Sequence, residues 1–266
     1  MMTLIAAIVT VLVTIPVVAV VVTASYLRVP IRHGSIYEKV QYFWARAVVR
    51  GSGVRTHVHG AEHIEQRGPC VYVANHVSWY DVFCLASVLP RWSFVAKAEL
   101  RKIPIFGRGA EAVGTIFVER KNRRAAFQMY ETAAVRIREG ASVVVYAEGT
   151  RGDEYALRPF KKGPFVLAIS AGVPIIPVLI MGTREVMKRG QWLVSPGDVH
   201  LHFLPPIPTA GLQYGERDVL VEQVWSTMAG ALSTLYGIQS DRRNASGAEE
   251  PVEVAVPTPE APVMTQ

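Results

Sequence analysis

The sequence is poor in the residues that cross-link small proteins or bind structural metals. It contains two cysteines in 266 residues, Cys70 and Cys84, and both lie in apolar runs. This number and spacing provide neither a disulfide framework nor a metal-ligand motif, so we interpret both as core residues. A P-loop and a Gly-rich dinucleotide loop are also absent, which argues against the usual nucleotide-binding folds. No nucleic-acid-binding module or aromatic-plus-basic repeat accompanies the net charge of +6, so we predict no nucleic-acid partner.

Charged side chains are missing from residues 3–27, which are almost wholly apolar. As a helix this segment would be about 37 Å long, enough to cross a bilayer with some tilt. Pro16 should kink that helix. A signal peptide is the competing interpretation, but a basic n-region and a convincing cleavage site are both lacking. Basic residues follow directly, so the positive-inside rule predicts a cell-membrane protein whose globular part faces the cytoplasm; these residues are Arg28, Arg32, Lys39, Arg46 and Arg50.

A second helix is predicted immediately after this segment. Its apolar residues recur at helical spacing: Ile36, Val40, Phe43, Trp44 and Ala47. With its aromatic and basic residues, this amphipathic helix is suited to a membrane interface, and packing on the globular domain is the alternative. We therefore divide the chain into a membrane-anchoring two-helix segment (1–50), an α/β domain (51–239) and a disordered acidic, Pro-rich tail (240–266).

The charge of the globular part favours a negatively charged partner. Residues 244–266 carry four Glu and no Lys or Arg, so the rest of the chain is more basic than the total of +6. A basic body suits anionic lipid headgroups or phosphorylated substrates.

The middle of the chain alternates between short β-branched runs and helical patterns. The predicted strands cover residues 54–58, 71–73, 92–96, 114–118, 142–146, 175–181 and 199–203. The predicted helices begin at Ser78 and cover residues 123–139, 164–171 and 216–236. Residues 103–107 are expected to form an apolar loop. Such alternation predicts an α/β fold with a mainly parallel or mixed central sheet flanked by helices.

A His and an Asp stand five residues apart where the strand 71–73 gives way to a helix. His76 is predicted to lie in the turn and Asp81 in the first helical turn, so that the carboxylate can reach back to the imidazole. Such a pair forms a general base, because the carboxylate fixes the tautomer and stabilises the imidazolium. The alternative is structural: Ser78 and Asp81 also match an acidic capping box.

A Gly-rich, basic loop follows the buried strand 142–146. It contains Glu148, Gly149, Thr150 and Arg151 and lies at the carboxyl end of a strand, where α/β sheets usually bind ligands. The glycine permits close backbone approach, the threonine offers a hydroxyl, and the arginine offers a two-pronged contact to phosphate. A solvated basic loop is the alternative. Glu148 could accept a hydrogen bond from a substrate or pair with an arginine.

Two pairs of histidines alternate along predicted strands, His57 with His59 and His200 with His202. Each pair would point both imidazoles to one face of the sheet, so a metal pair is conceivable. Apart from Asp198, no Cys, Asp or Glu neighbours the His200–His202 pair in the sequence. We therefore predict neither a metal nor a cofactor.

Four motifs in order carry a family resemblance: Asn75–Asp81, Gly114–Arg120, Glu148–Arg151 and Val173–Val178. Together they resemble the 1-acylglycerol-3-phosphate acyltransferase family, over about residues 35–205. The resemblance implies transfer of a fatty acyl group from acyl-CoA or acyl carrier protein to lysophosphatidic acid, giving phosphatidic acid. The alternatives are another acceptor, such as a lyso-aminolipid or glycerol-3-phosphate, and a non-catalytic lipid-binding protein. Intact His76 and Asp81 argue against the last.

The resemblance also implies roles for individual residues. His76 would deprotonate the acceptor hydroxyl and Asp81 would orient it. Arg120 and the loop 148–151 would bind the acceptor phosphate, and the segment with Pro174 and Pro177 would shape the acyl site. Lys97 and Lys162 would add to the anion site. The sequence departs from many relatives at Gly152, where they have Ser.

Overall fold

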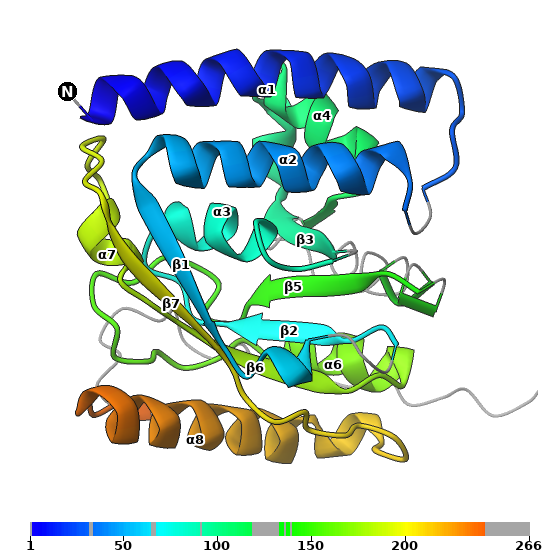
Figure 1. Ribbon diagram of the computed structural model, residues 1–266. Helices are drawn as coiled ribbons and strands as arrows, with labels where there is room; N and C mark the ends of the chain where they lie inside the picture. Colours follow the sequence, from blue (N-terminus) through cyan, green and yellow to red (C-terminus); the bar gives the residue numbers. More distant parts are fainter. Residues whose placement is uncertain are drawn as a thin grey trace, which may run out of the picture.

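The protein is built around one seven-stranded sheet in the order β1-β7-β6-β2-β5-β3-β4 (Figure 1). The computed structural model describes residues 2–31, 34–64, 68–90, 92–118, 133–135, 137–138 and 140–242. Its strands are β1 (Val54–His59), β2 (Val71–Ala74), β3 (Trp92–Lys97), β4 (Ile116–Val118), β5 (Ser142–Tyr146), β6 (Ile175–Met181) and β7 (Gly197–Phe203). Neighbouring strands are parallel except β6 and β7. The predicted mixed, mainly parallel sheet is therefore confirmed.

Helices cover both faces of the sheet (Figure 1). They are α1 (Met2–Tyr26), α2 (Ile36–Gly51), α3 (Tyr80–Ala86), α4 (Phe106–Ala112), α6 (Gly163–Ala171), α7 (Thr183–Val186) and α8 (Arg217–Tyr236). Helices α2 and α3 lie on one face, and α6 and α8 lie on the other (Figure 1). Of the predicted helix 123–139, the residues that the structure describes, 133–135 and 137–138, are helical.

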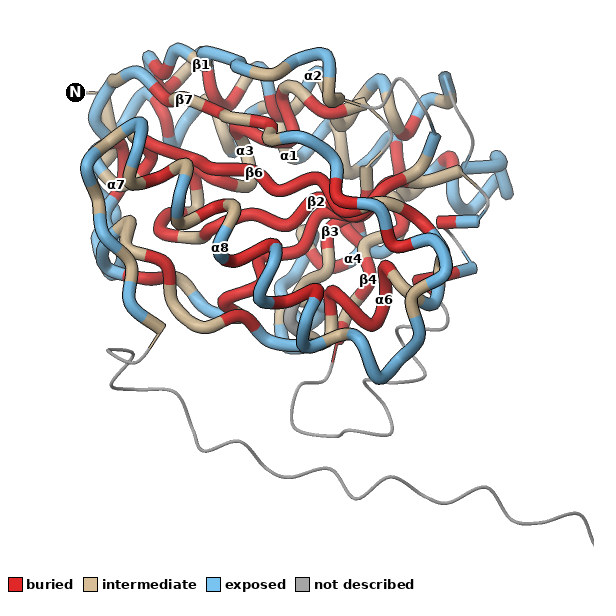
Figure 2. The backbone as a smooth tube through the Cα atoms, turned by 90° about the horizontal axis from the view of Figure 1, so that it is seen from below, coloured by how far each residue is buried: buried red, intermediate tan, exposed pale blue. Residues whose placement is uncertain are grey.

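The central strands separate two apolar cores, and this explains their unbroken apolar runs. In β2, Val71 and Val73 point into the core under α6 and α8, whereas Tyr72 and Ala74 point into the core under α2 and α3. Strand β5 alternates in the same way. Figure 2 shows the central strands β2 and β6 as buried segments. Burial on both faces is typical of a parallel sheet covered by helices, and it leaves the ends of the strands as the places for polar chemistry.

Helix α4 corrects one prediction, because the apolar loop expected at residues 103–107 gives way to a helix at Phe106. Two glycines in α4 made a helix improbable from local propensity. One of them, Gly109, lies so close to α1 that an added Cβ would stand 2.7 Å from Val18 Cγ2. The glycine therefore permits close packing of α4 on α1, and this tertiary contact outweighs its low helix propensity.

The N-terminal helices α1 and α2 lie side by side above the α3 face (Figure 1). Helix α1 continues through Pro16, is long and apolar enough to cross a membrane, and exposes most of its large side chains. Helix α2 buries Ala45 and Val49 in the domain core, as the packing alternative expected. The predicted stripe nevertheless keeps Ile36 and Phe43 exposed. The helix thus packs on the domain and still offers apolar side chains at its surface.

Candidate active site

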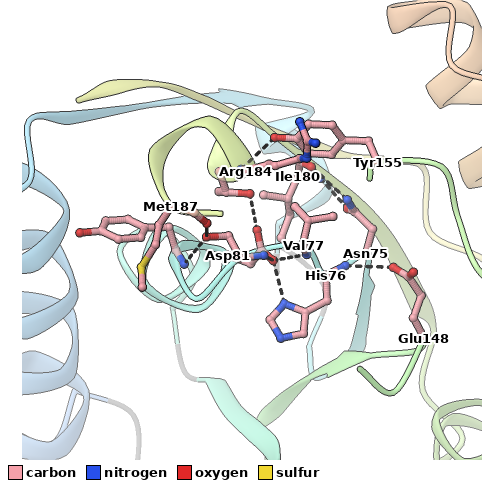
Figure 3. Close-up of polar contacts among 12 residues, drawn as sticks. Asn75, His76, Val77, Asp81, Glu148, Tyr155, Ile180, Arg184 and Met187 are labelled. Carbon is pink, nitrogen blue, oxygen red and sulfur yellow. Dashed lines mark hydrogen bonds and ion pairs between the residues drawn. The ribbon is translucent and has the colours of Figure 1, made fainter. Parts of the chain in front are cut away.

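The turn between β2 and α3 is held in place by a buried asparagine. Asn75 is 1% exposed, and its side chain pairs with the backbone of Ile180 in β6 (Figure 3). The amide Nδ2 donates to the Ile180 carbonyl at 3.0 Å, and Oδ1 accepts from the Ile180 N–H at 2.8 Å. The side chain thereby extends the β2–β6 ladder by one step after the strand has ended. The chain is fixed where His76 leaves the sheet.

His76 and Asp81 meet as predicted. His76 Nδ1 lies 2.7 Å from Asp81 Oδ2, in the turn that leads into α3 (Figure 3). The carboxylate is fully buried and the imidazole is 14% exposed. No described residue hydrogen-bonds to the other ring nitrogen, Nε2, so that nitrogen is available to a substrate. A buried acceptor on Nδ1 selects the tautomer that carries its lone pair on Nε2, which is the arrangement of a general base.

The same carboxylate also holds the turn that leads into α3, although the capping interpretation is met only in part: Trp79 occupies the N-cap position and makes no side-chain cap hydrogen bond. Asp81 Oδ2 accepts the backbone N–H groups of Val77 and Ser78, each at 2.8 Å. Asp81 Oδ1 accepts the hydroxyl of Thr183 at 2.5 Å. These four contacts fix the carboxylate rigidly and offset the cost of burying its charge.

The loop that contains Glu148 forms hydrogen bonds with both the N–H and the carbonyl of His76. Glu148 Oε1 accepts the His76 N–H at 3.0 Å, and the His76 carbonyl accepts the Gly152 N–H at 2.7 Å. Glu148 also accepts the Arg158 N–H, so it makes backbone contacts and no direct arginine ion pair is formed among the described residues. Burial raises the pKa of Glu148 to about 7, although both backbone hydrogen bonds oppose the shift. At Gly152 an added Cβ would lie 3.2 Å from the Glu154 carbonyl oxygen, a tight but not severe contact.

An aromatic stack connects His76 to an apolar cavity. The His76 ring stacks on Tyr146 at 4.0 Å between centroids, and Tyr146 stacks on Phe94 at 6.1 Å. Phe94 lines a cavity between the α1–α2 pair, α4 and the sheet. Its walls are almost entirely apolar and include Val18, Val21, Trp44, Trp92, Phe94 and Phe106. The cavity therefore begins two ring contacts from the imidazole.

A cationic group lies beside the dyad. The Arg151 guanidinium stands over the Trp79 ring at 4.6 Å, at the start of α3. Desolvation lowers the pKa of Arg151, and the positive charge of Arg189 lowers it further. Arg189 is held by Asp153 at 3.0 Å. A partly buried guanidinium with a second one near enough to lower its pKa makes a favourable site for an anion.

The remaining predicted site residues are placed less closely together. Gly149 adopts a left-handed backbone with φ of 78° and its N–H bonds the Tyr146 carbonyl, so it makes the turn out of β5. Thr150 is exposed in that turn. Lys162 forms an ion pair with Asp218 of α8 at 2.9 Å, so its charge is partly matched there. Lys97 ends β3, and its side chain lies outside the described part of the chain, as does the whole of Arg120.

The proline segment 174–177 belongs to the sheet. Pro174 precedes β6 and its carbonyl accepts the Val71 N–H, at the opposite end of the strand from Ile180. Among the described residues, its hydrogen bonds go to neighbouring strands and not to the dyad, and its role at the acyl site stays a prediction.

Sequence reasoning missed the contribution of the segment after β6. Thr183 bonds Asp81, and the Met187 carbonyl accepts the Ser78 hydroxyl at 2.7 Å. The Tyr155 hydroxyl accepts the N–H groups of Gly182 and Arg184 and so positions this segment (Figure 3). Thr183 stands 102 positions from Asp81 and Met187 stands 109 from Ser78, and no local spacing signals such contacts.

This arrangement can perform acyl transfer to a hydroxyl. It offers a base with an open nitrogen, a buried carboxylate to stabilise the charge that forms on it, cations for an anionic substrate, and an apolar cavity. A model of the family described as "Acyltransferase" matches residues 55–181. That interval contains the dyad, the loop 148–152 and strand β6.

Individual relatives agree with that match. The chain is 33% identical over 193 residues to human 1-acyl-sn-glycerol-3-phosphate acyltransferase alpha, covering 72% of this chain and 67% of the human one. It is 31% identical over 182 residues to the chloroplastic 1-acyl-sn-glycerol-3-phosphate acyltransferase BAT2 of Brassica napus, of which it spans about half, 51%. The crystal structure of the 1-acyl-sn-glycerophosphate (LPA) acyltransferase PlsC from Thermotoga maritima superposes with a TM-score of 0.72 at 25% identity, covering 90% of this chain and 97% of PlsC.

Proposed function

Because the chain belongs to the acyltransferase family, we propose that it transfers a fatty acyl group from an acyl thioester to the free hydroxyl of 1-acylglycerol-3-phosphate. The product would be phosphatidic acid, which places the enzyme in phospholipid biosynthesis. The observation that carries the proposal is the His76–Asp81 pair with its Nε2 open to a substrate. Binding a lipid without chemistry requires neither the imidazole nor its buried carboxylate.

In the reaction, His76 Nε2 takes the proton of the acceptor hydroxyl while that oxygen attacks the thioester carbonyl carbon. The buried Asp81 carboxylate stabilises the imidazolium that results. Collapse of the tetrahedral intermediate breaks the C–S bond, and His76 returns the proton to the departing thiolate. The thioester already has a good leaving group, so no covalent enzyme intermediate is required.

The acceptor phosphate binds at the cationic group beside the dyad. Arg151 supplies a two-pronged contact, and Arg189 stands close enough to lower its pKa. The family resemblance adds Arg120, Lys97, Thr150 and Lys162 to this anion site. Gly149 lets the loop turn toward the ligand with its left-handed backbone.

An acyl chain of one substrate occupies the apolar cavity. Its lining of aliphatic and aromatic side chains suits a hydrocarbon, and the Phe94–Tyr146–His76 stack connects it to the base. Two of its walls come from α1 and α2, so the membrane-anchoring helices and the catalytic domain build this cavity together.

The acceptor is a membrane lipid, so the enzyme works at a bilayer surface. The apolar helix α1 attaches the protein to the cell membrane, and the basic residues after it place the domain on the cytoplasmic side, where acyl-CoA and acyl carrier protein are made. Exposed Ile36 and Phe43 of α2 suit headgroup depth.

The test is a panel of lysolipids offered to the purified full-length protein with either acyl-CoA or acyl carrier protein as donor. We expect lysophosphatidic acid to be acylated faster than glycerol-3-phosphate or a lyso-aminolipid. The matched control is His76→Ala, which should lower turnover by about 10²- to 10⁴-fold. Preference for a lyso-aminolipid would reassign the acceptor. Binding of lysolipid with no transfer to any acceptor would favour the non-catalytic alternative.

A further inference from the structure

Four of the seven histidines form one cluster on β1 and β7, at the edge of the sheet. Strands β1 and β7 are parallel, with His57 opposite His200 and His59 opposite His202. The two pairs, conceivable as separate sites in the sequence, are therefore a single group. Figure 1 shows β1 and β7 running side by side, and they are the last two strands at one edge of the sheet, whereas His76 follows the central strand β2.

Three of these side chains are close enough to share one ion. A ring nitrogen of each of His59, His200 and His202 lies within 4.8 Å of the nitrogens of the other two. His59 Nε2 and His200 Nδ1 stand only 3.1 Å apart. Two imidazoles on a tetrahedral zinc ion at 2.0–2.1 Å have nitrogens about 3.3 Å apart, so this pair already has the spacing of two ligands.

His202 has the outer contact that metal-binding histidines usually have. Its Nε2 lies 2.6 Å from the hydroxyl of Tyr236, near the end of α8. Donation from Nε2–H to that oxygen leaves the lone pair of His202 on Nδ1. A ligating histidine generally donates its second ring N–H in this way, which fixes the tautomer and the ring orientation.

One ring of the cluster has to rotate before the three lone pairs can meet at one ion. The rings of His59 and His202 are stacked at 4.3 Å, so His59 must turn for its lone pair to meet the others. His59 is exposed, which leaves it free to turn.

We propose that His59, His200 and His202 form a transition-metal site that binds Zn²⁺ or a similar borderline ion such as Co²⁺ or Ni²⁺. Imidazole nitrogens suit these ions, and three of them leave a coordination position for water. His57 stays outside the site, because its Nε2 is held 2.7 Å from Asp198. The ion joins the edge strand β1 to β7 and, through Tyr236, to α8.

The experiment titrates Co²⁺ and Zn²⁺ into untagged, metal-stripped full-length protein in detergent. We expect one Co²⁺ per chain with the intense visible absorption of a tetrahedral nitrogen site, and competition by Zn²⁺. His59→Gln should weaken binding by at least about tenfold, and Tyr236→Phe by about tenfold through the lost outer contact. His63→Gln is the matched control, a histidine near β1 but outside the cluster, and should bind like the wild type. His57→Gln should also retain binding.

Thermal unfolding provides a second measurement. Saturating Zn²⁺ should raise the Tm of the wild type and of His63→Gln, and leave the Tm of His59→Gln and His202→Gln unchanged. Because His59 takes no part in acyl transfer, His59→Gln without added metal should keep wild-type activity, so the site can fail while the proposed function holds. Absence of stoichiometric Co²⁺ binding, or equal weakening by His63→Gln and His59→Gln, would overturn the site and leave four stacked imidazoles.

Discussion

The substitution Asp81→Asn separates the two tasks of the buried carboxylate. Asn can place its oxygen where Oδ2 stands and keep the N–H groups of Val77 and Ser78 as donors, while its amide nitrogen donates to the Thr183 hydroxyl. The hydrogen bonds that hold the turn into α3 therefore survive the change. The change does remove the negative charge that lies 2.7 Å from the His76 ring, so the imidazolium is no longer stabilised.

The magnitudes differ for activity and for stability. Replacing the aspartate of a His–Asp pair by Asn in serine proteases lowers turnover by about 10⁴-fold, and loss of a general base by about 10²- to 10⁴-fold, so we expect about 3–5 kcal/mol in the barrier. Each charge-assisted hydrogen bond weakened to a neutral one costs about 1 kcal/mol, and relief from burying a charge offsets part of that. The variant should remain folded with a modest fall in Tm.

Thr183→Val is the matched control for this experiment. It removes the bond to Oδ1 and leaves the charge and the His76 contact in place. We expect the Tm of Thr183→Val to fall about as much as that of Asp81→Asn, and its turnover to fall by less than about tenfold. Turnover and Tm would be measured on both variants in the same detergent. The reasoning fails if Asp81→Asn stays within about threefold of wild-type turnover, or if Thr183→Val loses as much activity at equal Tm.

Three further predictions concern the anion site, the buried glutamate and the N-terminus. Arg151→Ala should raise the KM for lysophosphatidic acid by about one to two decades and the KM for the thioester much less. Arg151→Lys should restore the KM for lysophosphatidic acid only in part. A larger effect on the KM for the thioester would assign Arg151 to the donor's phosphates. Burial raises the pKa of Glu148 from 4.5 to about 7, so between these pH values the folded state holds a proton that the unfolded state has released. The free energy of unfolding of the wild type is therefore highest below pH 4.5 and falls as the pH rises toward 7. Denaturant unfolding should show that, from pH 4.5 to 7, the free energy of unfolding of Glu148→Gln increases by about 3 kcal/mol relative to that of the wild type. If the two proteins have parallel pH profiles, the pKa of Glu148 is not raised. Deleting residues 1–30 should weaken membrane attachment and abolish most activity on long-chain acceptor in vesicles while sparing a short-chain acceptor; equal activity on vesicles would show that α1 serves only for targeting.

Much of the fold could be predicted because its signals are local. A β-branched run such as 142–146 is buried on both faces, so its sequence shows a central strand without knowledge of its neighbours. The His76–Asp81 pair was also accessible, since both residues belong to one strand–turn–helix unit and the geometry of that unit determines their distance. Helix α4 was missed because Gly109 permits close packing against α1, and this contact outweighs local propensity.

Tertiary structure alone decided which distant residues complete each site. Asn75 reaches Ile180 and Asp81 reaches Thr183 only because β6 pairs with β2 in one particular register. In the same way, His59 and His202 are 143 positions apart by residue number and become neighbours only because β7 turns antiparallel to β6 and lies parallel to β1. Strand order and register depend on the burial of both sheet faces at once, a property of the whole core that no single segment of the chain contains.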